Sequence, residues 1–118
     1  MRERRVLEWE TVETGSEDMV LFRLRGRLTG TKESYDFLED VRDAVRDGRI
    51  NVVINAEKLE RVSSPGVGVI AACFTSVMNA KGSLALTQVS KQLQTLLEIV
   101  CLWDLLGHYA SEDEALGI

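Results

Sequence analysis

Residues 55–70, with the sequence NAEKLERVSSPGVGVI, decide the fold of this chain. A mostly apolar run precedes them at residues 50–54 and predicts a buried strand, and an apolar-periodic segment at residues 65–80 predicts a helix. Pro65, the only proline, has the fixed φ that suits a first helical position, and it biases Ser64 towards an extended backbone. We therefore expect a loop between the strand and the helix that ends with Ser64 as the helix N-cap.

Two hydroxyl groups, those of Ser63 and Ser64, then stand at the start of this helix. The first backbone N–H groups of a helix have no partner within it, and the helix dipole makes this end electropositive. A loop that follows a strand and opens a helix is therefore a good place to hold an anion or a phosphoryl group. The simpler alternative is that Ser64 only caps the helix, which contributes about 1 kcal/mol.

Apolar periodicity predicts the elements on either side of this stretch. The predicted strands cover residues 6–12, 19–28, 50–54 and 83–89, with an optional short strand at residues 108–110. The predicted helices cover residues 32–47, 65–80 and 91–100, and residues 111–114 have the pattern of a capping box that opens a last helical turn.

The order of these elements predicts one α/β domain over residues 1–118. The first two strands, joined by a short turn, form an antiparallel pair. Residues 50–89 form a βαβ unit, which crosses over in the right-handed sense. The expected architecture is a mixed sheet of four to five strands with the main helices packed on one side.

Charge and composition limit the classes of function that the chain can have. The net charge of −5 disfavours nucleic-acid binding, and no window approaches the roughly 18 consecutive apolar residues that a membrane span needs. No apolar segment of the signal-peptide kind follows residues 1–5. The two cysteines, Cys73 and Cys101, are far apart in apolar segments, which favours a reduced compartment, the cytoplasm.

The chain offers no recognisable catalytic or cofactor chemistry. His108 is the lone histidine, with no identifiable nucleophile or orienting group, and we expect it to be structural. The cysteines and histidine do not form a metal cluster, so we expect no catalytic residue, metal or cofactor. Arg23, Arg25 and Arg27 share one strand face, which is either a solvated surface or a surface for an acidic partner.

Four segments in the same order resemble the STAS domain of bacterial anti-sigma-factor antagonists. Gly26-Arg27-Leu28 resembles the family's Gly-x-Leu-Asp, and Val52-Val53-Ile54-Asn55 resembles its hydrophobic strand ending in Asp. Ser63-Ser64-Pro65-Gly66-Val67-Gly68 resembles its Asp-Ser-Ser-Gly-Leu-Gly loop. The segment 109–116 resembles its acidic ending in Ala-Leu.

The resemblance implies a protein-interaction module that is not an enzyme. In this family the unphosphorylated domain binds an anti-sigma factor that is also a serine kinase, phosphorylation in the loop ends the binding, and a PP2C-type phosphatase restores it. Carried over to this sequence, the partner-binding residues are Thr29, Gly30, Ser63, Ser64, Pro65, Gly66, Val67 and Gly68. Gly68 would let the helix lie close to the sheet or to a partner.

The sequence departs from the family's pattern at three positions, two in the loop and one after Gly26-Arg27-Leu28. Pro65 stands where the family has its phosphorylated serine, Ser63 stands at its Asp, and Thr29 stands at its acidic residue after Gly-x-Leu. We therefore take Ser64 as the first candidate for phosphorylation and Ser63 as the second.

Proline at the usual acceptor position also favours a second class of function, a STAS scaffold that is not phosphorylated. Such a scaffold assembles with itself or with sensor proteins, as in stressosome-like complexes, or serves a transport apparatus. A large stable homo-oligomer would support the scaffold, and a monomer or weak homodimer the antagonist. A third class is a module that binds a small molecule or nucleotide.

Overall fold

A computed structural model describes residues 6–118; residues 1–5, to which the signal-peptide prediction refers, lie outside the described part. The strands are β1 (Leu7–Glu13), β2 (Met19–Leu28), β3 (Asn51–Val62), β4 (Ser83–Thr87) and β5 (Gly107–Tyr109). The helices are α1 (Lys32–Arg46), α2 (Ser64–Asn79), α3 (Lys91–Ile99), α4 (Glu112–Leu116) and the short 3-10 helix η1 (Trp103–Leu105).

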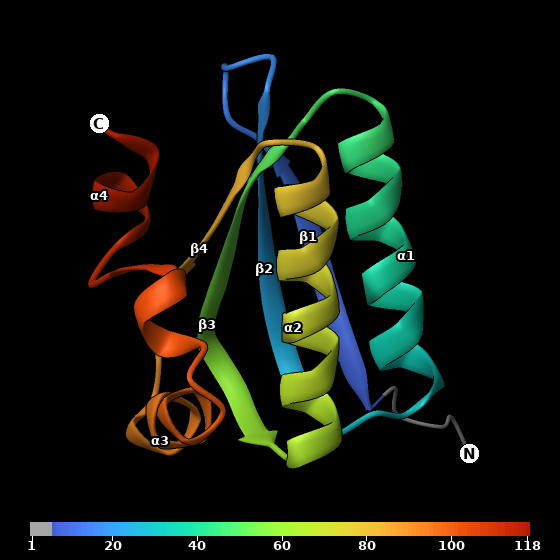
Figure 1. The fold of residues 1–118 in the computed structure, drawn as a ribbon, viewed down its shortest axis with the longest axis vertical. Helices are drawn as coiled ribbons and strands as arrows, with labels where there is room; N and C mark the ends of the chain where they lie inside the picture. The colour runs from blue at the N-terminus through green and yellow to red at the C-terminus, as the bar shows by residue number, and fades with distance from the viewer. Residues whose placement is uncertain (1–5) are drawn as a thin grey trace.

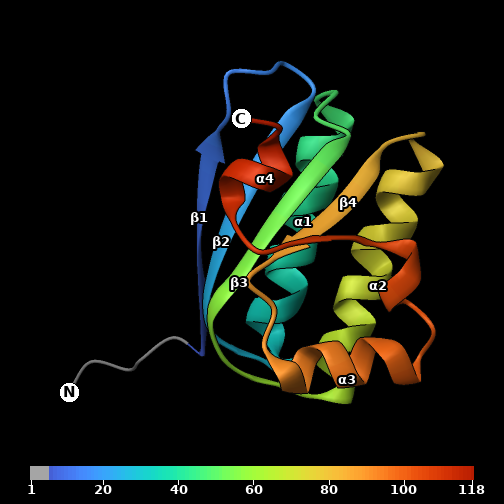
Figure 2. The same ribbon diagram turned by 90° about the vertical axis from the view of Figure 1, so that its left-hand side faces the viewer.

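The five strands form one mixed sheet in the order β1-β2-β3-β4-β5. β1 and β2 are antiparallel, and the remaining neighbours are parallel. The two long helices, α1 and α2, cover one face of the sheet (Figure 1), which confirms the predicted architecture. The short α4 lies on the opposite face (Figure 2).

The main core lies between the sheet and the layer of α1 and α2. Val20, Phe22 and Leu24 alternate along β2, and all three are buried in this layer. Phe37 of α1 packs edge-to-face on Phe22, with ring centroids 5.4 Å apart, and on Trp9 of β1, with centroids 5.5 Å apart. Burying a large apolar side chain contributes about 1.5–3 kcal/mol, so this aromatic contact fixes where α1 sits on the sheet.

The sequence prediction is wrong for the second half of β3. The strand was expected to end at residue 54, but it continues to Val62. β2 is ten residues long and still offers a paired edge there, with Arg25 opposite Lys58 and Leu28 opposite Val62. The polar side chains of this half are exposed, so the segment lacks the apolar pattern from which strands are predicted.

Smaller differences occur at the ends of elements. α1 ends at Arg46 with Asp47 as its C-cap, and α3 ends at Ile99. β4 ends at Thr87 because Gln88 has a left-handed backbone with a φ of 55°. The predicted last helical turn is confirmed as α4, where the Ser111 hydroxyl accepts a hydrogen bond from the Glu114 N–H at 3.2 Å.

None of the helices within residues 6–118 combines the length and the apolar character that crossing a bilayer requires.

Candidate functional site

The candidate site lies at the carboxyl ends of β2 and β3, where α1 and α2 begin (Figure 1). Because β2 and β3 are parallel, the segments that follow them emerge side by side. Thr29 and Gly30 follow β2, and Ser63 follows β3. The fold therefore brings together the two segments that the sequence assigned to partner binding.

Gly30 and Pro65 hold these segments in contact. A Cβ atom built on Gly30 would lie 2.5 Å from the Pro65 Cβ, so only a glycine fits against the proline ring. The Gly30 backbone has a φ of +83°, a conformation that other residues rarely adopt. Its N–H donates a hydrogen bond to the Oγ of the buried Ser34 at 3.1 Å.

Gly66 brings the start of α2 against the end of β2. A Cβ atom at Gly66 would lie 1.9 Å from the carbonyl oxygen of Leu28, and the Ser63 N–H donates to the same oxygen at 3.2 Å. Gly68 is different, since it is exposed and a Cβ there would meet nothing within 4 Å. Of the two roles expected for Gly68, close approach to the sheet is therefore wrong, and Gly66 has that role; close approach to a partner stays a prediction.

The two serines occupy different environments. Ser63, and not Ser64 as predicted, is the N-cap of α2: its backbone is extended, with φ −111° and ψ 175°, and its carbonyl accepts the first helical bond from the Val67 N–H at 2.9 Å. The Ser63 Oγ is buried and has no hydrogen-bond partner among the described residues. Ser64 is the first helical residue and is exposed, so its hydroxyl is the accessible one.

The N-cap prediction failed because Pro65 is tolerated at more than one position of the first helical turn. The sequence placed Pro65 first in the helix, whereas the structure places it second. The neighbouring helix α1 repeats the arrangement at this end of the sheet. Its N-cap is Thr31, whose buried hydroxyl also has no partner in the described chain.

The exposed surface of the site consists of Ser64, Pro65 and Gly68, with Thr29 and Gly30 partly exposed beside them and Val67 buried beneath. The first turn of α2 has no acidic residue, so nothing on it counters the positive end of the helix dipole. The site therefore presents an exposed hydroxyl group, small side chains and a helix N-terminus, which favours added negative charge.

The histidine and the buried cysteine that the sequence singled out lie away from these serines in the described part of the chain. Within residues 6–118 no three histidine, cysteine or acidic side chains are grouped so that they could hold a metal ion. The His108 ring stacks on Trp103 with centroids 4.0 Å apart, away from the serines. Cys73 is buried, and burial raises the pKa of its thiol to about 12.

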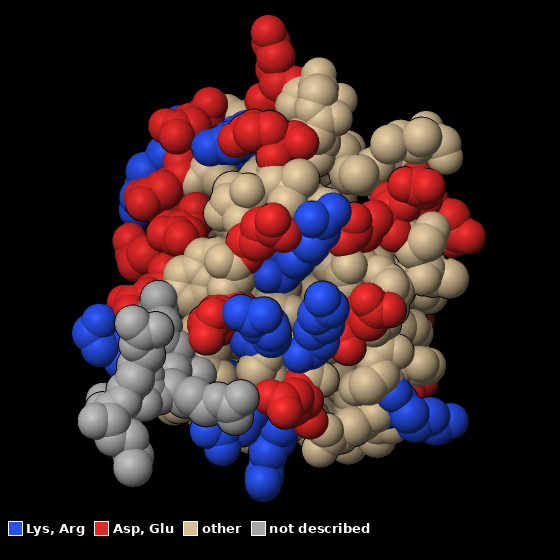
Figure 3. Space-filling view, turned by 180° about the vertical axis from the view of Figure 1, so that it is seen from behind, with Lys and Arg blue, Asp and Glu red and all other residues tan. Residues whose placement is uncertain are grey.

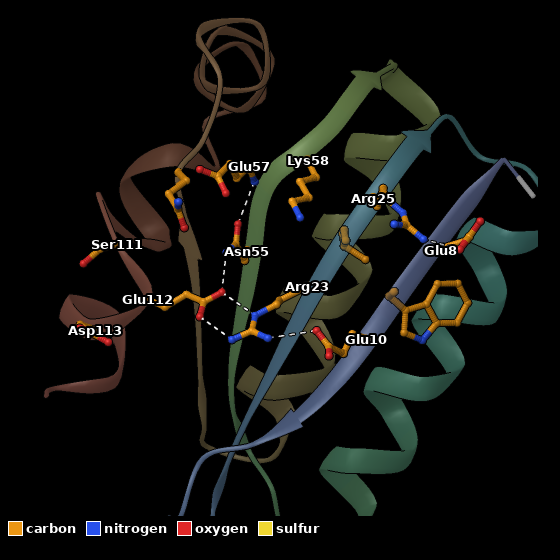
Figure 4. Close-up of a pocket in the computed structure, with 13 residues that line it drawn as sticks. Glu8, Glu10, Arg23, Arg25, Asn55, Glu57, Lys58, Ser111, Glu112 and Asp113 are labelled. Carbon is orange, nitrogen blue, oxygen red and sulfur yellow. Dashed lines mark hydrogen bonds and ion pairs between the residues drawn. The ribbon is translucent and has the colours of Figure 1, made fainter.

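A second polar cluster lies on the face of the sheet opposite α1 and α2 (Figures 3 and 4). Arg23 donates to Glu112 through Nε at 2.9 Å and through Nη2 at 3.0 Å, and to Glu10 through Nη1 at 3.0 Å. These bonds, chiefly the one with Glu112, raise the pKa of Arg23, and the bond from Arg23 lowers the pKa of Glu112. The sequence pattern pointed to Arg23, and it indicated residues 111–114 as a capping box within a family-like acidic ending, but it did not predict that the two segments meet.

Comparison with known proteins assigns the chain to a family. The family model described as the STAS domain matches residues 9–115. No curated protein matches the chain significantly.

Solved structures share the fold. The anti-sigma factor antagonist SpoIIAA in its unphosphorylated form is similar with a TM-score of 0.79 and 22% identity over 94% of this chain and 98% of that one. SpoIIAA of Bacillus in its phosphorylated form is similar with a TM-score of 0.75 and 21% identity, over 93% of this chain and 97% of that one. An anti-sigma factor antagonist from Mycobacterium paratuberculosis is similar with a TM-score of 0.79 and 14% identity, over 94% of this chain and 92% of that one.

Proposed function

The chain belongs to the STAS domain family, and on that premise we propose that it is a regulatory protein-interaction module, an antagonist of an anti-sigma factor. The observation that carries the proposal is the exposed Ser64 at the start of α2, next to Thr29 and Gly30. The proposed docking surface consists of Thr29, Gly30, Ser63, Ser64, Pro65, Gly66, Val67 and Gly68. The proposed partner is an anti-sigma factor with serine-kinase activity, acting in the cytoplasm.

Phosphorylation of Ser64 is the proposed switch. Pro65 has no hydroxyl, and the Ser63 Oγ is buried, so Ser64 is the accessible acceptor of this loop. A phosphate adds about −1.5 to −2 charges. The helix N-terminus tolerates this charge, because its free N–H groups and dipole stabilise an anion. A partner surface that fits a neutral hydroxyl does not tolerate it, so the complex dissociates until a PP2C-type phosphatase removes the phosphate.

Binding of the partner depends on the shape of the proposed docking surface. Gly30, Pro65 and Gly68 present no long side chain, so a partner can approach the backbone of both strand ends closely. The buried contacts of Gly30 and Gly66 keep this surface rigid before binding, which reduces the ordering cost of association.

Pro65 also supports a second candidate, a scaffold whose loop is never phosphorylated. In that case the same surface binds another copy of the chain or a sensor protein, and no kinase is needed. Sedimentation or light scattering of the purified chain separates the two. A large stable homo-oligomer supports the scaffold, and a monomer or weak homodimer supports the antagonist.

The test of the switch is incubation with each serine-kinase anti-sigma factor of the source organism and ATP, followed by mass spectrometry. The chains compared are the wild type, Ser63→Ala, Ser64→Ala and the double variant. We expect phosphate on the wild type and on Ser63→Ala, and none on the two variants that lack Ser64. Incorporation that survives the double substitution would eliminate this loop as the acceptor.

A further inference from the structure

The strand register sorts the open face of the sheet, opposite α1 and α2, into two rows of side chains. One row is mostly apolar and contains Val12, Leu21, Val53, Ala85 and Gly107. The next row is polar and contains Glu10, Arg23, Asn55, Thr87 and Tyr109. Paired residues of neighbouring strands point to the same face, so each row runs across the whole sheet.

The apolar row is covered, although it faces away from the main helices. Leu21 and Val53 are only 1% and 3% exposed. The element on this face is α4, which contacts β3, β4 and β5 and lies across the strands in Figure 2. Ala115 and Leu116 of α4 are half-buried. α4 therefore covers the part of this apolar row that β3 and β4 contribute, which the main core does not include.

One carboxylate anchors this cover to the polar row. The two oxygens of Glu112 accept hydrogen bonds from Arg23 at 2.9 and 3.0 Å, and Oε2 also accepts one from the Asn55 side chain at 2.5 Å (Figure 4). The Asn55 Nδ2 donates this bond, and the Oδ1 of the same amide accepts the Glu57 N–H at 2.8 Å, which fixes the orientation of the amide. The bidentate geometry gives this contact its directionality.

α4 itself is short, and its side chains are at most partly buried. α4 has five residues and none of them is buried. A helix of this length is not stable alone in water, so its order depends on docking. Beside it the open face continues as a cleft of about 750 Å³, lined in part by Arg25 and Lys58. Arg25 pairs with Glu8, whereas Lys58 makes no ion pair in the part of the chain that the structure describes.

We propose that this region is a second interaction surface, which binds a short acidic amphipathic helix of a partner protein in place of α4. We call it the open-face groove and define it by Leu21, Arg23, Val53, Asn55 and Lys58. The chemistry of the occupant follows from the groove. A carboxylate pairs with Arg23 and Asn55, small aliphatic side chains cover Leu21 and Val53, and a helix longer than α4 reaches the cleft and places a second carboxylate near Lys58.

α4 competes with such a helix within the same chain. The apparent affinity of a site is reduced by the fraction of molecules in which it is open. Weakening the Glu112 anchor should therefore raise the affinity for a helix supplied from outside. Asp113 provides a matched control, because it lies on the same helical turn and carries the same charge, but its side chain is exposed and makes no hydrogen bond or ion pair with a described residue.

The test is a titration of the full chain with a fluorescent peptide of the sequence ASEDEALGI, residues 110–118. The chains compared are the wild type, Glu112→Ala, Asp113→Ala and the double variant Arg23→Ala/Glu112→Ala. We expect Glu112→Ala to bind the peptide at least about tenfold more tightly than the wild type and Asp113→Ala do. We expect the double variant to lose that gain, as does a peptide in which Gln replaces the residue that corresponds to Glu112.

Hydrogen exchange supplies an independent readout on the same proteins. The amides of residues 114–117 should exchange faster in Glu112→Ala than in the wild type, while those of β2 and β3 stay equally protected. The proposal is overturned if Glu112→Ala does not bind the peptide, if it binds no better than the wild type, or if Arg23→Ala leaves binding unchanged. These variants lie on the face opposite α1 and α2 and leave Ser64 intact, so the outcome is separate from that of the Ser64 switch.

Discussion

Gly30 and Pro65 lie against each other so closely that a Cβ atom on Gly30 would come within 2.5 Å of the Pro65 Cβ. The two residues come from different strand ends, one after β2 and one after β3. Their contact joins the two ends into one surface and sets the position of the exposed Ser64 beside Thr29. The proposed docking surface therefore depends on a packing contact between two residues that have no reactive group.

Gly30→Ala should destabilise the chain through both its backbone and its packing. Adopting φ +83° costs a non-glycine residue about 1–2 kcal/mol, and the clash with Pro65 adds about 1–3 kcal/mol. Gly15→Ala is the control, since Gly15 has a φ of +87° and a Cβ there would meet nothing within 4 Å. Urea unfolding should show the larger loss for Gly30→Ala, and equal losses would contradict the packing contact.

The same substitution should have opposite effects at two positions in α2. Gly68→Ala should stabilise the chain by roughly 0.5–1 kcal/mol, because Gly68 is exposed within the helix and alanine is the better helix former. Gly66→Ala should destabilise it by about 1–3 kcal/mol, because the new methyl group meets the Leu28 carbonyl. Free energies of unfolding from urea titration check both signs; the same sign at both positions would show that the start of α2 is misplaced.

The two thiols should react very differently in the native protein. Cys101 is exposed, whereas Cys73 is buried on α2 with a pKa raised to about 12 by its burial. Iodoacetamide at neutral pH should therefore label Cys101 alone, and both cysteines after unfolding in urea. Peptide mapping by mass spectrometry checks this. Rapid labelling of Cys73 in the native chain would show that α2 does not pack on the sheet as described.

The docking of α4 should weaken in acid. The hydrogen bonds from Arg23 and Asn55 hold the pKa of Glu112 below its ordinary value of 4.5. A carboxyl group with a lowered pKa stabilises the folded state above that ordinary value, and this contribution is lost as the pH falls through the lowered pKa.

The stability difference between the wild type and Glu112→Gln should therefore be larger at pH 7 than at about pH 3. Measuring both chains at each pH cancels the titration of the other acidic groups. A difference that is the same at both values would mean that the charge of Glu112 does not hold α4.

The sequence predicted those parts of the fold in which burial repeats regularly. The alternation of Val20, Phe22 and Leu24 located β2, and the apolar spacing around Phe37 located α1. It did not predict the second half of β3. The side chains there, such as Lys58, are polar because they face solvent, and nothing in their pattern indicates that the backbone pairs with β2. Local pattern does not report pairing between distant segments.

The candidate site was predicted in part for similar reasons. A strand, two serines and a proline indicated a helix start, but only packing shows that Ser63 is the N-cap and that Gly66, not Gly68, contacts β2. The anchor of α4 joins Arg23 and Glu112, which are far apart in the sequence. No spacing rule connects such residues, so the open-face groove could be found only from the structure.

The central claim is that a partner binds the surface around an uncharged Ser64. The most direct test measures the affinity of the serine-kinase anti-sigma factor for the wild type, Ser64→Glu and Ser16→Glu. Ser16 is a matched control, because it is exposed in the turn between β1 and β2, at the end of β2 opposite the site. We expect Ser64→Glu to bind at least about tenfold more weakly, a loss of about 1.4 kcal/mol, and Ser16→Glu to bind like the wild type. Equal affinities for all three chains would contradict the claim.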